Sequence, residues 1–165
     1  MENQNIFLKQ ISLSDQAPML DILTSDVIKQ TYMLPDFSKR EDAAPLFDRL
    51  VSLSTDETRY VRGIYLDQKL IGFINDVEIQ NASIELGYVI HPDFHRKGYM
   101  TQALKKAIAE LFSIGYQEVI AGAFEENAAS IRVMKKNGMR KLEKTDEIEY
   151  RGKIHNCVYY HREKW

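Results

Sequence analysis

Short apolar runs, each bounded by polar or turn-forming residues, predict seven strands along the chain. They lie at 6–11, 60–66, 70–76, 84–90, 118–124, 140–146 and 153–161. The turn between the second and third runs is short and polar, which predicts a hairpin. Pro92 ends the fourth run, because proline has no amide hydrogen to give to a central strand pairing.

Apolar residues recur at helical spacing in four further segments. These segments are 14–24, 38–53, 100–112 with a stop at Gly115, and 128–136. Ser14 has the residue type of an N-terminal cap, and Ser38 with Glu41 has the spacing of a capping box. Asn127 should cap the last helix. The order β-α-α-β-β-β-α-β-α-β-β predicts a mixed sheet with helices packed on it.

Composition and charge place the chain among globular proteins. Its 165 residues fit a single domain over 1–165, and 44% are hydrophobic while 28% are charged. A net charge of -2 argues against nucleic acid or an anionic membrane as a partner. The one cysteine, Cys157, cannot form an internal disulfide. With no signal core and no apolar run near ~20 residues, we expect a cytoplasmic protein.

The segment 92–104 joins a predicted strand to the most regular predicted helix. Its loop is basic, with Arg96 and Lys97, and Gly98 lies where the helix begins. The first amides of a helix lack internal partners and the helix dipole is positive there, so a pyrophosphate can bind at this end. Gly98 would let the phosphates approach closely. An ordinary strand–helix turn is the alternative, since the spacing of the Walker and dinucleotide motifs is absent.

Three segments together closely resemble the GNAT acetyltransferase superfamily, in its RimJ/RimL-type branch of ribosomal-protein N-terminal acetyltransferases. They are 85–92, Lys97-Gly98-Tyr99 and 126–139. The resemblance implies an α/β (α+β) GNAT fold with a mostly antiparallel central sheet of about seven strands and about four flanking helices. It implies acetyl-CoA as cosubstrate, a primary amine as acceptor and no metal.

The resemblance also implies which residues contact acetyl-CoA. The family's loop pattern is Gln/Arg-x-x-Gly-x-Gly/Ala; this chain keeps Gly98 and departs from the pattern at His95 and Met100. The implied pyrophosphate contacts come from the backbone of 96–101, and a backbone amide near Val89 and Ile90 receives the thioester oxygen. The full implied set is Val89, Ile90, His95, Arg96, Lys97, Gly98, Tyr99, Met100, Thr101, Asn127 and Ser130.

Acetyl transfer needs a neutral amine, whereas an alkylamine of pKa near 10.4 is only about one part in a thousand neutral at pH 7. Our candidate base is Glu85, which the resemblance places in the acceptor cleft; it would act directly or through water. The alternative role for Glu85 is that of a strand carboxylate in an ion pair.

The candidate acid is Ser130, because Met134 stands where many family members have a tyrosine. A serine that only satisfies its own helix start is the alternative.

Tyr32, Glu85 and Tyr88 are the candidate contacts to the acceptor. The pocket should be built by the loop 31–35, the early helices and the last two strands. The acceptor is a protein N-terminal α-amino group or a small-molecule amine. Tyr159 and Tyr160 could line a substrate pocket or an interface, although sheet packing is the more frequent reason for aromatic residues in a strand. A homodimer stays open as an alternative.

Two other functions are alternatives to an acetyltransferase. An acyl-CoA-sensing module that has lost catalysis is favoured by the departures at Met100 and Met134. A nucleotide-binding regulatory domain could use the same helix start. His91 and His95 have the spacing of a metal pair on a helix, but Pro92 between them makes a helix improbable there, so no metal is expected.

Overall fold

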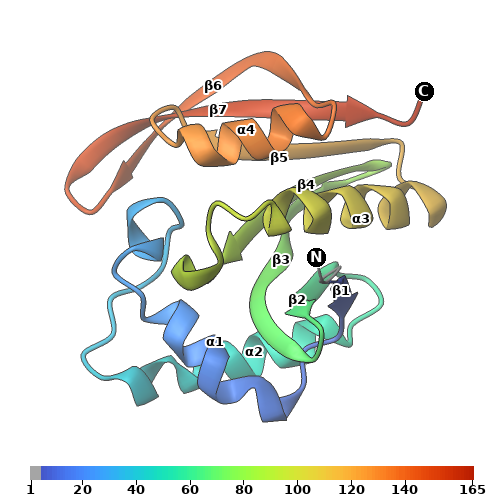
Figure 1. Ribbon diagram of the computed structural model, residues 1–165. Helices are drawn as coiled ribbons and strands as arrows, with labels where there is room; N and C mark the ends of the chain where they lie inside the picture. The colour runs from blue at the N-terminus through green and yellow to red at the C-terminus, as the bar shows by residue number, and fades with distance from the viewer. Residues whose placement is uncertain (1–4) are drawn as a thin grey trace. The chain divides into compact units, whose positions relative to one another are not determined.

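Seven strands form one mixed sheet in the computed structural model, which describes residues 5–165 (Figure 1). In chain order they are β1 (Ile6–Lys9), β2 (Val61–Leu66), β3 (Lys69–Gln80), β4 (Ser83–Ile90), β5 (Glu118–Phe124), β6 (Arg140–Tyr150) and β7 (Lys153–Glu163). The sheet order is β1-β2-β3-β4-β5-β7-β6. β4 and β5 pair in parallel, while β1 with β2, β2 with β3, β5 with β7 and β6 with β7 pair antiparallel. The predicted fold class is confirmed.

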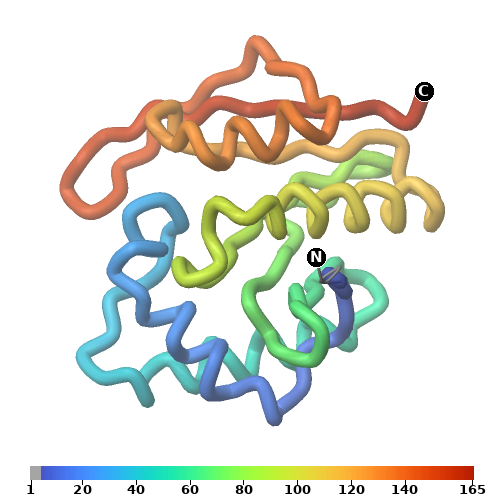
Figure 2. The backbone as a smooth tube through the Cα atoms, in the orientation of Figure 1, coloured from blue at the N-terminus to red at the C-terminus, as the bar shows by residue number. Residues whose placement is uncertain are grey.

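All four predicted α-helices are present. They are α1 (Gln16–Leu23), α2 (Ala44–Ser54), α3 (Tyr99–Ser113) and α4 (Ala128–Lys136). The predicted hairpin of β2 and β3 is present. The strands β6 and β7 also pair and run side by side in Figure 2. Within the described residues, no helix combines the length and the hydropathy that a membrane crossing requires.

The caps predicted for the first two helices were wrong. Ser12, not Ser14, begins the first helical segment: its hydroxyl accepts from the amide of Ser14 at 3.3 Å. Before α2, the carboxylate of Asp42 accepts from the amide of Lys39 at 3.1 Å. In both places a short 3-10 turn, Leu13–Asp15 or Arg40–Ala43, precedes the α-helix, so the cap belongs to that turn. The cap lies two residues before Ser14 in the first case and one residue after Ser38 in the second.

Contacts divide the chain into two compact units. The first unit combines Met1–Asn75 with Tyr88–Ala103, and the second combines Asp76–Gly87 with Leu104–Trp165. We describe them separately, and the expectation of a single domain over 1–165 stays a prediction. The core of the first unit joins α1 and α2 to β2 and β3. Its fully buried members include Met19, Ile22, Leu23, Phe47, Val61 and Phe73.

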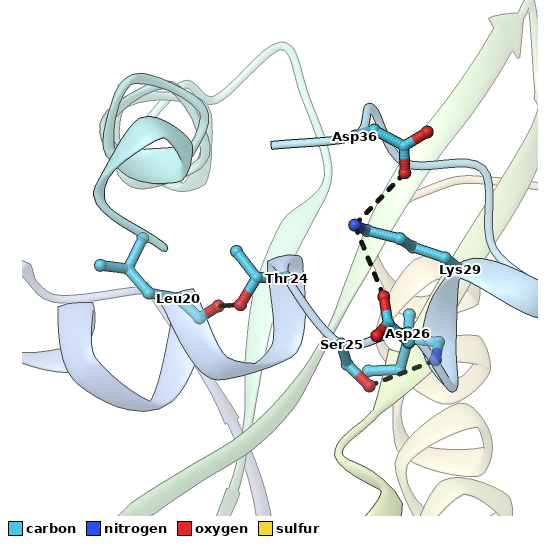
Figure 3. A network of polar contacts seen from close by, with 7 residues as sticks. Leu20, Thr24, Ser25, Asp26, Lys29 and Asp36 are labelled. Carbon is cyan, nitrogen blue, oxygen red and sulfur yellow. Dashed lines mark hydrogen bonds and ion pairs between the residues drawn. The ribbon is translucent and has the colours of Figure 1, made fainter. Parts of the chain in front are cut away.

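A buried lysine organises the loop that follows α1 in the first unit (Figure 3). The side chain of Lys29 is only 6% exposed, and its Nζ lies 3.4 Å from Asp36 and 3.9 Å from Asp26. A lysine buried to this extent requires such partners. The loop carries Tyr32, whose hydroxyl donates to Asn75 Oδ1 at 2.8 Å and whose ring meets Phe73 edge-on. Burial raises the pKa of Tyr32 to about 12.

In the second unit, side chains alternate across β4, β5 and β7. One face is buried and apolar, with Ile84, Leu86, Val119, Ala121, Val158 and Tyr160. The residues between them on β4 and β5 point to the other face, because successive side chains on a strand alternate. The register sets Glu85 beside Ile120 and Ser83 beside Glu118. Polar and ionisable groups therefore gather on that second face.

The first unit depends on a close approach between β3 and the end of β4. A Cβ added to Gly72 would lie 2.2 Å from the carbonyl oxygen of Val89 and 2.9 Å from the Cα of Ile90. These are backbone atoms, which cannot rotate away. Only glycine therefore lets the two strands lie at this separation.

We expect Gly72→Ala to lower the free energy of unfolding by about 1–3 kcal/mol, as overpacking does elsewhere. The matched control is Gly63→Ala on β2, where the new Cβ would meet only the Tyr65 side chain, at 2.7 Å. Urea unfolding of both variants measures the difference. Equal losses would contradict the claim that the backbone contact is decisive.

Candidate active site

The loop between β4 and α3 bends through two left-handed residues. Arg96 has φ 63° and Gly98 has φ 80°, and α3 begins at the next residue, Tyr99. The first bond along the helix runs from the amide of Gln102 to the carbonyl of Gly98, at 3.2 Å. His95 Nε2 lies 2.8 Å from the carbonyl oxygen of Ile90, which ties the loop back to the end of β4.

Gly98 meets a conformational need within the protein itself. A Cβ at this position would have no protein atom within 4 Å, so the positive φ is what favours glycine here. The chain from His95 to Gly98 is exposed, whereas Met100 is 8% exposed and packs inside the protein. The Met100 side chain therefore does not stand on the exposed surface of the loop.

Positive charge surrounds this loop. Arg96 and Lys97 belong to it, and Lys69 on β3 adds a third cation, which no sequence motif singles out. Lys69 Nζ lies 5.3 Å and Lys97 Nζ 5.9 Å from the centre of the Phe94 ring. The basic side chains and the N-terminal end of α3 together suit an anion.

In the second unit, Glu85 lines a small cavity of about 90 Å³. The lining residues come from β3, β4, β5, β6 and β7: Glu78, Gln80, Ser83, Glu85, Ile120, Leu142, Lys144 and Tyr159. Three of them, Leu142, Lys144 and Tyr159, lie on the last two strands. The cavity thus combines acidic groups with an apolar wall.

The surroundings of Glu85 favour its protonated form. Burial raises the pKa of Glu85 above its ordinary value of 4.5; the ammonium of Lys144 opposes this, and the carboxylates of Glu78 and Asp146 reinforce it. A carboxylate with a raised pKa holds a proton more readily, which suits a general base working near neutral pH.

Tyr159, which the sequence favoured as a packing residue over a pocket residue, lines the cavity of Glu85. Its hydroxyl donates to Asp146 Oδ2 at 2.7 Å, and Lys144 Nζ lies 4.6 Å from the centre of its ring. Burial, followed by the bond to Asp146, raises the pKa of Tyr159. A signal was available in Gly122, which pairs with Tyr159: a Cβ there would lie 2.9 Å from the ring. Glycine opposite an aromatic residue leaves room for the ring to lie across the neighbouring strand.

The start of α4 holds the other two predicted site residues of the second unit. Asn127 caps the helix as predicted, with its side-chain oxygen accepting from the amide of Ser130 at 3.2 Å. Ser130 is half-buried in the first turn. Met134, one turn later, is fully buried and has no proton to donate.

The predicted residues divide between the two units. The first unit contains Tyr32 and Tyr88, and the run from Val89 to Thr101, while the second contains Glu85, Asn127 and Ser130. Val89 and Ile90 are buried at the end of β4. The predicted roles of all these residues stay predictions.

One group of potential metal ligands occurs in residues 5–165. The ligand atoms of Glu118, His161 and Glu163 lie within 4.8 Å of one another. His161 Nδ1 lies 2.7 Å from Glu118 Oε2, and the hydroxyl of Ser83 donates to Glu118 Oε1 at 2.8 Å. These bonds already satisfy the Glu118 carboxylate, so the arrangement is accounted for as a hydrogen-bonded pair.

The comparisons with known proteins agree on one family, the acetyltransferases. The family described as "Acetyltransferase (GNAT) domain" matches residues 5–140. The uncharacterised N-acetyltransferase YoaA of Bacillus subtilis is 25% identical over 146 residues, covering 86% of this chain and 82% of its own.

Two solved structures share the fold. The microcin C7 self-immunity acetyltransferase MccE, in complex with acetyl-CoA and AMP, has a TM-score of 0.84 at 18% identity, with 98% of this chain and 93% of that chain covered. The ribosomal L7/L12 α-N-protein acetyltransferase RimL has a TM-score of 0.83 at 18% identity, with coverages of 98% and 91%. The resemblance read from the three sequence motifs is thus confirmed at the level of the family, and the chain belongs to the GNAT acetyltransferases.

Proposed function

We propose that the protein transfers the acetyl group of acetyl-CoA to a primary amine by direct attack within a ternary complex. The observation that carries the proposal is Glu85, a half-buried carboxylate with a raised pKa that lines a cavity in a GNAT acetyltransferase. The exposed basic loop at Gly98 supports it, because a loop of this charge at a helix start suits a pyrophosphate.

Acetyl-CoA supplies the activated acetyl group and a thiol leaving group. The backbone of 96–101 binds its pyrophosphate in this proposal, with further contacts from Asn127. A backbone amide near Val89 and Ile90 faces the thioester oxygen, where negative charge develops during attack. The complex of MccE with acetyl-CoA and AMP supports the choice of cosubstrate, since that protein shares this fold.

Two side chains of the second unit move the protons. Glu85 accepts a proton from the acceptor ammonium, directly or through water, which leaves a lone pair on nitrogen. The nitrogen attacks the carbonyl carbon, the carbon–sulfur bond breaks, and an amide forms. The attacking nitrogen must lose a second proton for the neutral amide to form. Ser130 donates a proton to the departing thiolate and regains one from that nitrogen, so the protons balance. Each such proton transfer contributes about 10²–10⁴-fold to the rate of an enzyme.

Acetyl-CoA should raise the melting temperature of the protein, because a ligand that binds only the folded state stabilises it.

The variant Gly98→Ala tests whether the loop at Gly98 binds acetyl-CoA. Its positive φ makes alanine cost about 1–2 kcal/mol of stability. We also expect weaker acetyl-CoA binding in calorimetry. Gly152→Ala is the matched control, since Gly152 has φ 75°, no protein atom near its Cβ position, and a place in the β6–β7 turn.

Both glycine variants should lose similar stability, and only Gly98→Ala should lose affinity. Equal affinities in the two variants would contradict the proposed loop. A larger stabilisation by ATP or NAD than by acetyl-CoA would instead support the nucleotide-binding alternative.

Glu85→Gln should lower kcat about 10²–10⁴-fold and leave the Kd for acetyl-CoA unchanged, because the amide cannot accept the proton. Release of free thiol over a full pH profile measures this. The matched control is Glu143→Gln on β6, which removes the same charge from an exposed position outside the cavity lining. Unchanged turnover in Glu85→Gln would exclude the role.

The same variant has a stability signature. Because the pKa of Glu85 is raised in the folded state, the free energy of unfolding falls as pH rises from 4.5 through the folded pKa. Glutamine carries no such penalty. Glu85→Gln should therefore melt at a higher temperature than the parent at pH 7, and the gap should close at acid pH, where Glu85 is protonated in both states.

Ser130→Ala should lower turnover on acceptors with acetyl-CoA by about 10²-fold or more if the hydroxyl protonates the thiolate. Ser113→Ala, at the end of α3, removes a hydroxyl that only bonds its own helix and should leave turnover unchanged. Wild-type rates in Ser130→Ala, with folding verified by melting, would assign the serine to the helix start alone.

A further inference from the structure

The cavity of Glu85 carries excess negative charge. Glu78 from β3 and Glu85 from β4 line it, and Asp146 from β6 is bound to the Tyr159 hydroxyl at its wall. Lys144 from β6 is the one cation among the lining residues. Three carboxylates facing one ammonium leave two negative charges unbalanced when all are ionised. Glu118 on β5 is hydrogen-bonded to His161 and Ser83 and is not among the residues that line the cavity.

The cavity is small and partly apolar, with a volume of about 90 Å³. Ile120, Leu142 and the ring of Tyr159 supply an apolar wall. Such a space suits the end of an unbranched methylene chain that carries an ammonium better than it suits a bulky sugar ring.

The protein's own Lys144 shows how an alkylammonium is held there. Its Nζ lies 4.6 Å from the centre of the Tyr159 ring and 4.0 Å from Asp146 Oδ2. A cation over an aromatic face with a carboxylate nearby is a recurrent way to bind amines. The side chain is 57% exposed, and it lies where the pairing of β6 with β7 is irregular, between Lys141 and Thr145. Because more than half of the side chain is exposed, its ammonium can move into solvent.

We propose that the acceptor is a linear aliphatic polyamine, and that one of its ammonium groups binds among Glu78, Glu85 and the Tyr159 ring in place of Lys144 Nζ. This inference rests on the proposed acetyl transfer and names its substrate class. With Lys144 Nζ displaced, Glu78, Glu85 and Asp146 carry up to three negative charges, which call for more than one cation, and a linear polyamine supplies several. A peptide N-terminus brings one, together with backbone groups that need hydrogen-bond partners.

The first test compares acceptors by the release of free thiol from acetyl-CoA. The probes are spermidine, n-butylamine as a monoamine of similar width, an N-terminal tripeptide and an aminoglycoside. We expect kcat/KM for spermidine to exceed that of each other probe by at least about tenfold. Its KM should rise with added salt, because charge pairing is screened.

Variants of the cavity sharpen the test. Glu78→Gln should raise KM for spermidine up to about fivefold, with a smaller effect on n-butylamine. Glu143→Gln is the matched control and should change neither. Lys144→Met should lower KM for spermidine. It should also move the acid limb of the kcat/KM profile to higher pH, because the Lys144 ammonium lowers the pKa of Glu85.

The outcomes separate this inference from the proposed function. If the tripeptide or the monoamine is the better acceptor, or if Glu78→Gln and Glu143→Gln behave alike, the polyamine assignment is overturned while acetyl transfer stands. If no amine releases thiol although acetyl-CoA binds, acetyl transfer itself is overturned, and the acyl-CoA-sensing alternative takes its place.

Discussion

The alternation of side chains on β4 and β5 determines which face of the sheet carries the candidate base of the second unit. Ile84 and Leu86 are buried on one face, so Glu85 between them must point to the other. A slip of one residue in register would bury the carboxylate and expose the two apolar neighbours. The hydrophobic effect on one face thus holds the candidate base in place on the other.

Much of the fold was predictable because it depends on local patterns. Period-two and helical spacing found the strands and helices, and Asn127 and its helix were correct to the residue. The caps at Ser14 and Ser38 failed because 3-10 turns precede those helices, and such turns leave little trace in apolar spacing. The longer extent of β3 was also missed, since 77–80 lie beyond the predicted strand.

The candidate site was less predictable, because it depends on register between distant segments. Glu85 and the Gly98 loop were found through motifs. The Glu85 cavity required knowing that Glu78, Lys144 and Tyr159 converge on it from three other strands. No local pattern contains that information, and the irregular pairing between Lys141 and Thr145 further hides which way Lys144 points. A net charge of -2 likewise conceals both a basic loop in one unit and an acidic cavity in the other.

The buried position of Cys157 has a practical consequence. It is the chain's one thiol, it is 6% exposed on β7, and burial raises its pKa. Thiols react as thiolates, so a buried thiol with a raised pKa reacts slowly with electrophiles and oxidants. The native protein should therefore contribute little background to colorimetric reagents that titrate coenzyme A as it is released, and it should tolerate air during storage without forming linked dimers.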